Sequence, residues 1–241
     1  MFKRNQYLIM AFAFVLLIGS LGLRSVSAKE TATDASEWAQ NAANVLSEMM
    51  GIKEEGIPTD LMSHAEAVAV FPHMVKGGFV VGGQYGKGLV SDRMANGRWS
   101  TPSFVKIGGG SFGLQIGAEA TDLVLVFTSK EGFKGLLDGK LKLGADAAVA
   151  AGPVGRDAQV ATDVLLKSPV LAYSRSKGAF AGITLNGAVV SIDESENQKV
   201  YGKELTAQDI LYNGRARMNN IVAPFVQALD KYAPAAKRVT D

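Results

Sequence analysis

The chain has 241 residues with 47% hydrophobic side chains, 20% charged side chains, no cysteine and a formal net charge of +2. A chain of this length and composition can bury the core of one globular domain. The lack of cysteine excludes thiolate catalysis, cysteine-ligated metals and disulfides, and the small net charge gives no global attraction to nucleic acid.

The first residues have the three-part pattern of a secretory signal peptide. Two basic residues precede an apolar run from Tyr7 to Ile18, and residues 26–28 place small side chains at a cleavage position. This run is shorter than the roughly 20 apolar residues that a membrane-spanning helix needs. We therefore predict a signal peptide over residues 1–28, cleavage after Ala28, and a periplasmic or secreted protein that is peripheral to a membrane. A retained N-terminal anchor is the alternative.

Removal of this segment would change the net charge of the chain from +2 to −1, because it carries three basic residues and no acidic one. The basic character of the whole chain therefore belongs largely to the segment that is removed. Any site for phosphate or lipid must then be a local cluster of basic residues rather than a property of the whole surface.

A loose leader and two helices are predicted before the first strand. Residues 29–35 are small and polar and form the leader, the domain then spans residues 36–231, and residues 232–241 form a frayed tail. The first helix covers residues 36–50, where apolar side chains recur at helical spacing. Thr59 is the expected N-cap of a short helix near residues 60–64.

From Ala65 the chain changes to short segments that are rich in glycine and β-branched residues. Strands are predicted over residues 67–71, 104–107, 112–116, 123–127, 141–151, 170–174, 178–185 and 188–192, a glycine-rich hairpin over 77–93 with its turn at 86–88, further turns at 96–97 and 186–187, and helices over 129–137, 206–211 and 219–232. Glycine within strands indicates bends or close approach of backbones, as a strongly coiled sheet requires. The pattern predicts an α+β fold in which a strongly twisted antiparallel β-sandwich or barrel-like core is flanked by N- and C-terminal helices.

Two pairs of similar segments suggest that the β core is an internal duplication. Lys76-Gly-Gly-Phe resembles Lys177-Gly-Ala-Phe, and LQIGAEA from residue 114 resembles LKLGADA from residue 141. Convergent strand composition is the alternative explanation for these similarities.

The glycine cluster GGGSFG at residues 108–113 matches two motifs that carry chemistry. The dinucleotide motif GxGxxG needs a helix that starts at its last glycine, and the hydrolase motif GxSxG needs a strand–turn–helix around Ser111 with an acid and a histidine further along the chain. The following residues alternate as a strand does, and His64 and His73, the two histidines of the chain, both precede Ser111. The cluster is therefore predicted to shape the sheet, and a serine hydrolase that uses Ser111 is the least favoured function.

No metal ion or cofactor is predicted from the sequence. Two histidines nine positions apart match no common spacing of metal ligands. The acidic run DESEN at residues 193–197 lacks the glycine and the distal glutamate of an EF-hand calcium loop. We therefore predict that this run is a solvated turn.

The ordered set of strand motifs resembles the SYLF domain family. The matching segments are AEAVAVFP, KGGFVVGGQYGKGLV, GRWSTPSFVKIGGGSFGLQIGAEATDLVLVF, LGADAAVAAGPVGR, AYSRSKGAFAGITLNGAVV and NQKVYG, which together span residues 65–202. The resemblance implies a non-enzymatic lipid-binding module. It also implies that eukaryotic members bind phosphoinositides or phosphatidic acid, that some bundle actin, and that bacterial members are often exported.

This chain departs from the family where its eukaryotic members use a basic amphipathic N-terminal helix for lipid contact. Residues 36–50 contain no lysine or arginine and contain Glu37 and Glu48. That lipid site is therefore not carried over to this chain. Actin is not an expected partner either, because an exported protein would not meet it.

We predict that the domain binds anionic phospholipid headgroups through basic residues on turns beside glycine. The candidates are Lys76, Arg93, Arg98, Lys106, Arg156, Arg175 and Lys177. Arg156 is the favoured one, because the backbone N–H groups of a glycine-rich turn can form an anion-binding concavity and a guanidinium can bind phosphate with two hydrogen bonds. The alternative membrane contact is insertion of the apolar stripe formed by Trp38, Val45, Met49 and Ile52. A function of another class is that of an envelope protein-interaction or structural factor without a lipid ligand.

Overall fold

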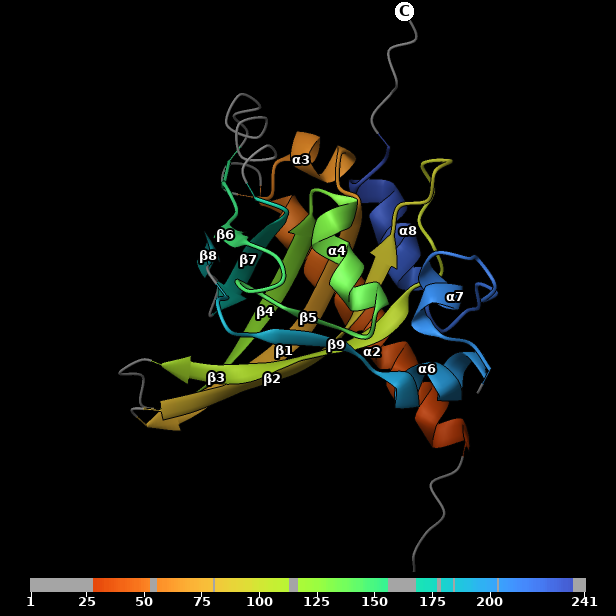
Figure 1. Cartoon of the computed structure of the whole chain (residues 1–241), viewed down its shortest axis with the longest axis horizontal. Coiled ribbons are helices and arrows are strands. Elements are labelled where there is room, and N and C mark those ends of the chain that lie inside the picture. Colours follow the sequence, from red (N-terminus) through yellow and green to blue (C-terminus); the bar gives the residue numbers. More distant parts are fainter. Residues whose placement is uncertain are drawn as a thin grey trace, which may run out of the picture.

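The computed structural model of the chain describes residues 28–52, 56–79, 81–112, 117–155, 168–176, 179–183, 185–202 and 204–235. Nine strands in these ranges form one sheet in the order β5-β9-β3-β2-β1-β4-β7-β6, with β8 also paired to β7. The sheet curls into a half-barrel with helices against both of its faces (Figure 1). The predicted α+β class is confirmed, and the core is the barrel-like alternative, since the described strands belong to a single sheet.

The elements follow each other along the chain in a simple order. The strands are β1 (Ala67–Phe79), β2 (Val81–Asp92), β3 (Ser103–Phe112), β4 (Gly117–Phe127), β5 (Lys140–Lys142), β6 (Val149–Ala151), β7 (Val170–Ser176), β8 (Ala179–Gly182) and β9 (Val189–Ile192). The helices are α2 (Ala28–Gly51), α3 (Thr59–Ser63), α4 (Lys130–Leu137), α6 (Glu194–Tyr201), α7 (Ala207–Leu211) and α8 (Ala223–Tyr232). All strand pairs are antiparallel except the short parallel pair of β6 and β7.

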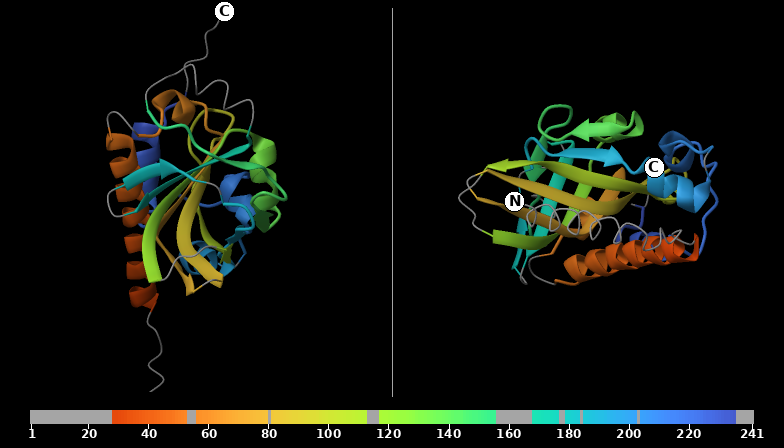
Figure 2. Two further views of the ribbon diagram at one scale, coloured as in Figure 1. Left: turned by 90° about the vertical axis from the view of Figure 1, so that its left-hand side faces the viewer. Right: turned by 90° about the horizontal axis from the view of Figure 1, so that it is seen from below.

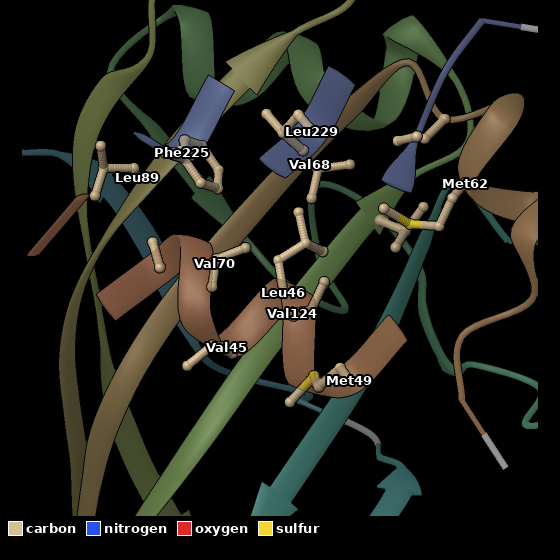
Figure 3. Packing of buried hydrophobic residues seen from close by; sticks show 14 of the residues in the cluster. Val45, Leu46, Met49, Met62, Val68, Val70, Leu89, Val124, Phe225 and Leu229 are labelled. Carbon is tan, nitrogen blue, oxygen red and sulfur yellow. The ribbon is translucent and has the colours of Figure 1, made fainter. Parts of the chain in front are cut away.

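Side chains on the convex, outer face of the sheet form one hydrophobic core with α2 and α8. Along each strand every second residue points to this face, so Val68, Val70 and Val124 lie in the same layer. Leu46 of α2 and Phe225 of α8 pack against that layer (Figure 3). The apolar stripe of α2 is therefore covered by the sheet. This burial stabilises the helix in the segment where apolar residues recur at helical spacing.

The concave, inner face of the sheet carries a second core. Its members include Phe71, Val105 and Phe127, and it is closed by α4, α7 and the two strands β5 and β9. The rings of Phe127 and Phe133 meet edge to face with centroids 5.4 Å apart. Figure 2 shows α4 and α2 on opposite sides of the curled sheet.

Three helices differ from their predicted form. Helix α2 begins at Ala28, so residues 29–35 are helical and not a loose leader. Helix α3 has Pro58 and not Thr59 at its N-cap. The acidic run at 193–197 is not a solvated turn: Asp193 caps α6, and the buried amide of Asn197 accepts a hydrogen bond from the Phe104 N–H at 2.9 Å. Because the side-chain amide of Asn197 accepts a hydrogen bond from a strand backbone, this segment has a structural role that its acidic composition alone does not indicate.

The predicted starts of two helices and the position of one predicted turn are confirmed. Ser129 caps α4, and Thr206 forms a capping box with Asp209 at the start of α7. Gly97, between β2 and β3, has a φ of 81°, as the Asn-Gly turn requires. These signals depend only on neighbouring residues, so the sequence is sufficient to place them.

The predicted turn at residues 86–88 is wrong, because these residues lie inside β2. Beyond these residues, strands β1 and β2 stay paired as far as the pair Phe79 and Val81. Strand β3 extends to Phe112 and β4 starts at Gly117, so the strand predicted over 112–116 falls mostly outside the described residues.

The similar segments that suggested a duplication occupy unlike positions. Lys76-Gly-Gly-Phe lies within strand β1, whereas only the last two residues of Lys177-Gly-Ala-Phe are described, and they begin strand β8. Gly117 lies in strand β4, whereas Gly144, its counterpart in the second pair, has a φ of 87° in a turn. Shared strand composition explains these similarities better than duplication does.

Candidate functional site

Four strands continue beyond helix α2 and form an arm at one end of the molecule (Figures 1 and 2). We define the arm as residues 74–79 of β1, 81–88 of β2, 105–112 of β3 and 117–122 of β4. The cross-strand register is continuous between β2 and β3 over this whole length. The faces of the arm therefore follow from the alternation of side chains in the two cores.

A row of polar residues crosses the outer face of the sheet at the base of the arm. Directly opposed pairs join Lys140, Ser191, Lys106 and Lys87 on one side of β1, and Asp122 and Arg175 on its other side. His73 of β1, whose N–H donates to Asp122, lies between these two groups. His73 belongs to a bulge in β1, where the register with both neighbouring strands shifts by one residue. We call this set the polar row.

Beyond the polar row, the outer face of the arm shows apolar side chains that none of the helices in the described ranges covers. Val75 and Tyr85 oppose each other on β1 and β2, and they are 50% and 52% exposed. The same row continues through Gly108 and Val189 to Lys142 on β5. Large apolar side chains that face water together at a sheet surface mark an interaction site more strongly than scattered ones do.

The cations of the polar row differ in whether an acid neutralises them. Lys106 Nζ lies 3.1 Å from the buried Asp193 carboxylate. Arg175 pairs with Asp122 at 2.8 Å and also with Glu48 of α2, and the hydrogen bond to Asp122 raises the pKa of the Arg175 guanidinium. By contrast, the ammonium groups of Lys87, Lys140 and Lys142 have no carboxylate partner in the part of the chain that the structure describes.

The bulge at His73 fixes the geometry at the centre of the polar row. His73 has a φ of 51°, which is uncommon for a residue with a side chain, and its N–H donates a 3.0 Å hydrogen bond to Asp122 Oδ1. Its imidazole is 67% exposed and lies 3.5 Å from the same carboxylate oxygen. Asp122 thus holds both the bulge and Arg175, which joins β1, β4 and β7 at the base of the arm.

The seven predicted headgroup residues do not form one cluster. Lys106 and Arg175 share the polar row, but both have acidic partners. Lys76 points to the inner face, because it follows Val75 in the strand, and Arg98 is exposed on the turn between β2 and β3. Arg156 and Lys177 lie outside the described residues, so their roles stay predictions.

Arg93 is a structural residue, and its guanidinium is not available to a ligand. The residue is 9% exposed, and it donates hydrogen bonds to the carbonyl oxygens of Ala65 at 2.7 Å, Met62 at 3.0 Å and Ala233 at 3.0 Å. Its guanidinium also lies over the Trp99 ring at 4.1 Å. Burial lowers the pKa of this guanidinium, which is consistent with a group that is enclosed rather than offered to solvent.

The apolar stripe proposed for membrane insertion is part of the core. Val45 and Met49 are buried against the sheet (Figure 3). Trp38 and Ile52 are partly buried. Insertion would require α2 to leave the sheet and to uncover the outer core. The folded protein therefore does not offer this stripe to a membrane.

The glycine cluster was predicted to shape the sheet, and its described residues lie inside β3, which is longer than the strand predicted over 104–107. Residues 108–112 belong to β3, and Ser111 pairs with Gly82 of β2. The described residues on both sides of the cluster form strands β3 and β4, so they contain neither a helix start for a dinucleotide nor the strand–turn–helix of a nucleophile elbow. The geometry therefore gives no support to a serine hydrolase at Ser111.

The described residues contain neither a group of metal ligands nor a helix that could cross a membrane. Among the described residues, no group of three or more histidine, aspartate or glutamate side chains could hold a metal ion. Within the same ranges, no helix combines the length and hydropathy that crossing a bilayer requires.

The sequence of the chain is similar to that of one described protein family. A family model named Ysc84 and described as Las17-binding protein actin regulator matches residues 108–232. LAS seventeen-binding protein 3 of Saccharomyces cerevisiae is 34% identical over 183 residues, which are 75% of this chain and 39% of the yeast protein. SH3 domain-containing YSC84-like protein 1 of Homo sapiens is 32% identical over 185 residues, which are 74% of this chain and 54% of the human protein. The chain thus spans about two fifths to about half of the length of these relatives.

Proposed function

Because the chain belongs to the Ysc84 (SYLF) family, we propose that it is a non-enzymatic module that binds an anionic membrane surface through the outer face of its arm. The observation that carries this proposal is the opposed pair of Val75 and Tyr85, which stand exposed on a sheet face that none of the described helices covers. A tyrosine at such a position suits the membrane interface, where its ring is apolar and its hydroxyl stays in contact with water.

The charges around this pair support an anionic surface as the ligand. Lys87 lies two residues from Tyr85 on the same face, and Lys142 ends the row that contains Tyr85. Both ammonium groups lack a carboxylate partner among the described residues. Each basic residue near an anionic membrane contributes about 1 kcal/mol of binding free energy, and the contribution falls off within a Debye length.

Glycine makes the outer face of the arm flat beyond the apolar pair. Gly77, Gly83 and Gly110 oppose one another on three neighbouring strands and point to this face. With no side chains there, a bilayer surface can approach the backbone closely. A flat, weakly charged apolar surface with lysines at its border is what a peripheral membrane protein needs.

The lysines are tested by replacing Lys87 and Lys142 with glutamine together. Sedimentation with vesicles of phosphatidylcholine and phosphatidylglycerol should show binding about 25-fold weaker, since two residues at about 1 kcal/mol each correspond to that factor. Raising the salt concentration should reduce wild-type binding in the same direction. The matched control is Arg98→Gln, an exposed basic residue away from the arm, which should bind as the wild type does.

The apolar pair has its own test, which separates a membrane surface from simple charge attraction. Val75→Ser with Tyr85→Ser should weaken sedimentation with the same vesicles even at high salt, because the loss is one of apolar burial. Thermal unfolding should change little, since both side chains are already half exposed. If the doubly substituted protein binds as the wild type does, the arm is not the membrane site. If the wild type binds no anionic vesicles, the envelope protein-interaction factor becomes the better proposal.

We also propose that the protein is exported to the bacterial envelope, on the basis of the signal-peptide pattern in residues 1–28. Intact-mass measurement of material from the periplasm should give a protein that begins at Lys29. A mass that includes residues 1–28 would indicate an anchor instead. The family is described as an actin regulator, but actin regulation is not part of the proposal, because an exported protein would not meet actin.

A further inference from the structure

The segment between α7 and α8 is a second place where large apolar side chains face water. We define the α7–α8 loop as residues 212–222. Its Tyr212 and Met218 are 62% and 43% exposed. In the described part of the chain, the exposed large hydrophobic residues are Val75, Tyr85, Val154, Tyr212 and Met218. Four of these five belong to the arm or to this loop, so exposed apolar surface is concentrated at two places.

The two places lie at opposite ends of the long axis of the molecule. In Figure 1, which has this axis horizontal, the arm projects on the left and the α7–α8 loop lies beside α7 on the right. The view from below in Figure 2 shows the same separation. A surface in contact with the loop is therefore distinct from the surface that the arm would contact.

The α7–α8 loop is basic as well as apolar. It carries Arg215 and Arg217, and the sequence has no acidic residue between Asp209 and Asp230. Arg215 pairs with Asp209 at 3.1 Å, whereas Arg217 has no carboxylate partner within the described ranges. A ligand of this loop should thus be anionic and should also accept apolar side chains.

Internal hydrogen bonds hold the loop in one conformation. Asp209 accepts from the Asn213 side chain at 3.1 Å, and its carbonyl oxygen accepts from the Arg215 N–H at 2.9 Å. The Thr101 hydroxyl donates to the Ala216 carbonyl oxygen at 3.1 Å, which ties the middle of the loop to the residues before β3. The Asn213 and Thr206 hydrogen bonds also lower the pKa of Asp209 to about 2, so this anchor stays ionised at any physiological pH. Binding would therefore cost little ordering entropy in the loop.

The shape of the loop favours a membrane over a protein as the anionic ligand. Tyr212, Arg217 and Met218 are exposed on one short loop, and a stable protein interface buries about 800 Å² on each partner. An anionic bilayer makes no such demand, because a few apolar side chains can enter the interface while arginine binds phosphate. We infer that the α7–α8 loop is a second membrane-contact site and that one molecule bridges two anionic bilayers, one at the arm and one at the loop. The bridging part rests on the proposed function of the arm.

Vesicle clustering tests the bridge separately from vesicle binding. The probe is a suspension of phosphatidylcholine and phosphatidylglycerol vesicles, with clustering followed by light scattering and binding followed by sedimentation. Wild-type protein should cluster these vesicles. Tyr212→Ser, Arg217→Gln and Met218→Ser together should reduce clustering at least about fivefold, the factor that one arginine alone contributes near an anionic surface, while the arm keeps the protein bound. The matched control combines Val154→Ser with Arg98→Gln, which removes one exposed apolar and one exposed basic residue outside both surfaces.

The outcomes separate the loop from the arm. If the triply substituted protein clusters vesicles as the wild type does, the loop is not a membrane site, and clustering comes from association of copies through their arms or from another surface. If the wild type binds vesicles without clustering them, the bridge is overturned. If the loop substitutions abolish sedimentation while the arm substitutions have no effect, the proposed function of the arm fails and the loop site stands. A midpoint of thermal unfolding equal to that of the wild type would show that the substituted protein is folded.

Discussion

Replacing Arg93 by methionine is expected to lower the free energy of unfolding by about 3–5 kcal/mol, although the two side chains have similar lengths. The guanidinium of Arg93 donates to three main-chain carbonyl oxygens that come from distant parts of the chain, at Met62, Ala65 and Ala233. Methionine has no donor, so the Ala65 carbonyl oxygen loses this partner inside the protein, whereas the Met62 carbonyl oxygen keeps only the Ala65 N–H at 3.3 Å. Each unsatisfied buried acceptor costs about 1–3 kcal/mol.

The loss should also loosen the end of the described chain. The Ala233 carbonyl oxygen keeps one donor, the Trp99 indole N–H at 3.2 Å, but the Trp99 ring loses the cation that lies over it. Hydrogen exchange in the last turn of α8 should therefore become faster. Lysine at position 93 should fall between arginine and methionine, because one ammonium group cannot reach three carbonyl oxygens in the same directions.

Arg98→Met is the matched control for this prediction. Arg98 belongs to the same turn between β2 and β3, but it is exposed and makes no side-chain ion pair in the described part of the chain. Urea unfolding of Arg98→Met should agree with the wild type within about 0.5 kcal/mol. Equal stabilities of the Arg93 and Arg98 substitutions would show that the carbonyl contacts of Arg93 contribute little.

These two arginines show why the fold was easier to predict than the site. Alternating side chains and capping residues are local signals, so most strands, the start of α4 and the start of α7 could be placed from neighbouring residues. Arg93 and Arg98 are five residues apart beside the same Asn-Gly turn, and nothing near them in the sequence distinguishes them. Their roles depend on contacts with Met62 and Ala233, which only the folded chain brings together.

The exposed apolar pair was missed because one hairpin turn was misplaced. The pairing of β1 with β2 extends to Phe79 and Val81, and this register opposes Val75 to Tyr85. A turn at 86–88 is incompatible with this pairing. The prediction therefore did not place Val75, Tyr85 and Lys87 on one face of the sheet. Predicting the polar row would also require the order of the strands in the sheet. Its members come from seven strands, and the order of these strands in the sheet differs from their order in the chain.

The glycines at 86 and 88 misled the prediction because they serve packing and not a turn. A Cβ at Gly86 would lie 3.1 Å from Met74 and 3.3 Å from Ile107 on the inner face. A Cβ at Gly88 would overlap the Val70 carbonyl oxygen and lie 2.8 Å from Phe71 Cδ1. Glycine inside a strand can mark close approach of another backbone as well as a turn, and only the register separates the two cases.

Gly88→Ala should therefore lower the free energy of unfolding by about 3 kcal/mol, at the upper end of the cost of overpacking. The added methyl group meets the backbone of β1 where it approaches its bulge, and a backbone cannot turn aside as the end of a flexible side chain can. The matched control is Gly110→Ala in β3, where a Cβ would have no neighbour within 4 Å among the described atoms. Chemical denaturation of both proteins gives the comparison, and the Gly110 substitution should stay within about 0.5 kcal/mol of the wild type. A Gly88 substitution as mild as that at Gly110 would mean that β1 can move away from β2 at its bulge, and that the glycine is not required by the packing of the sheet.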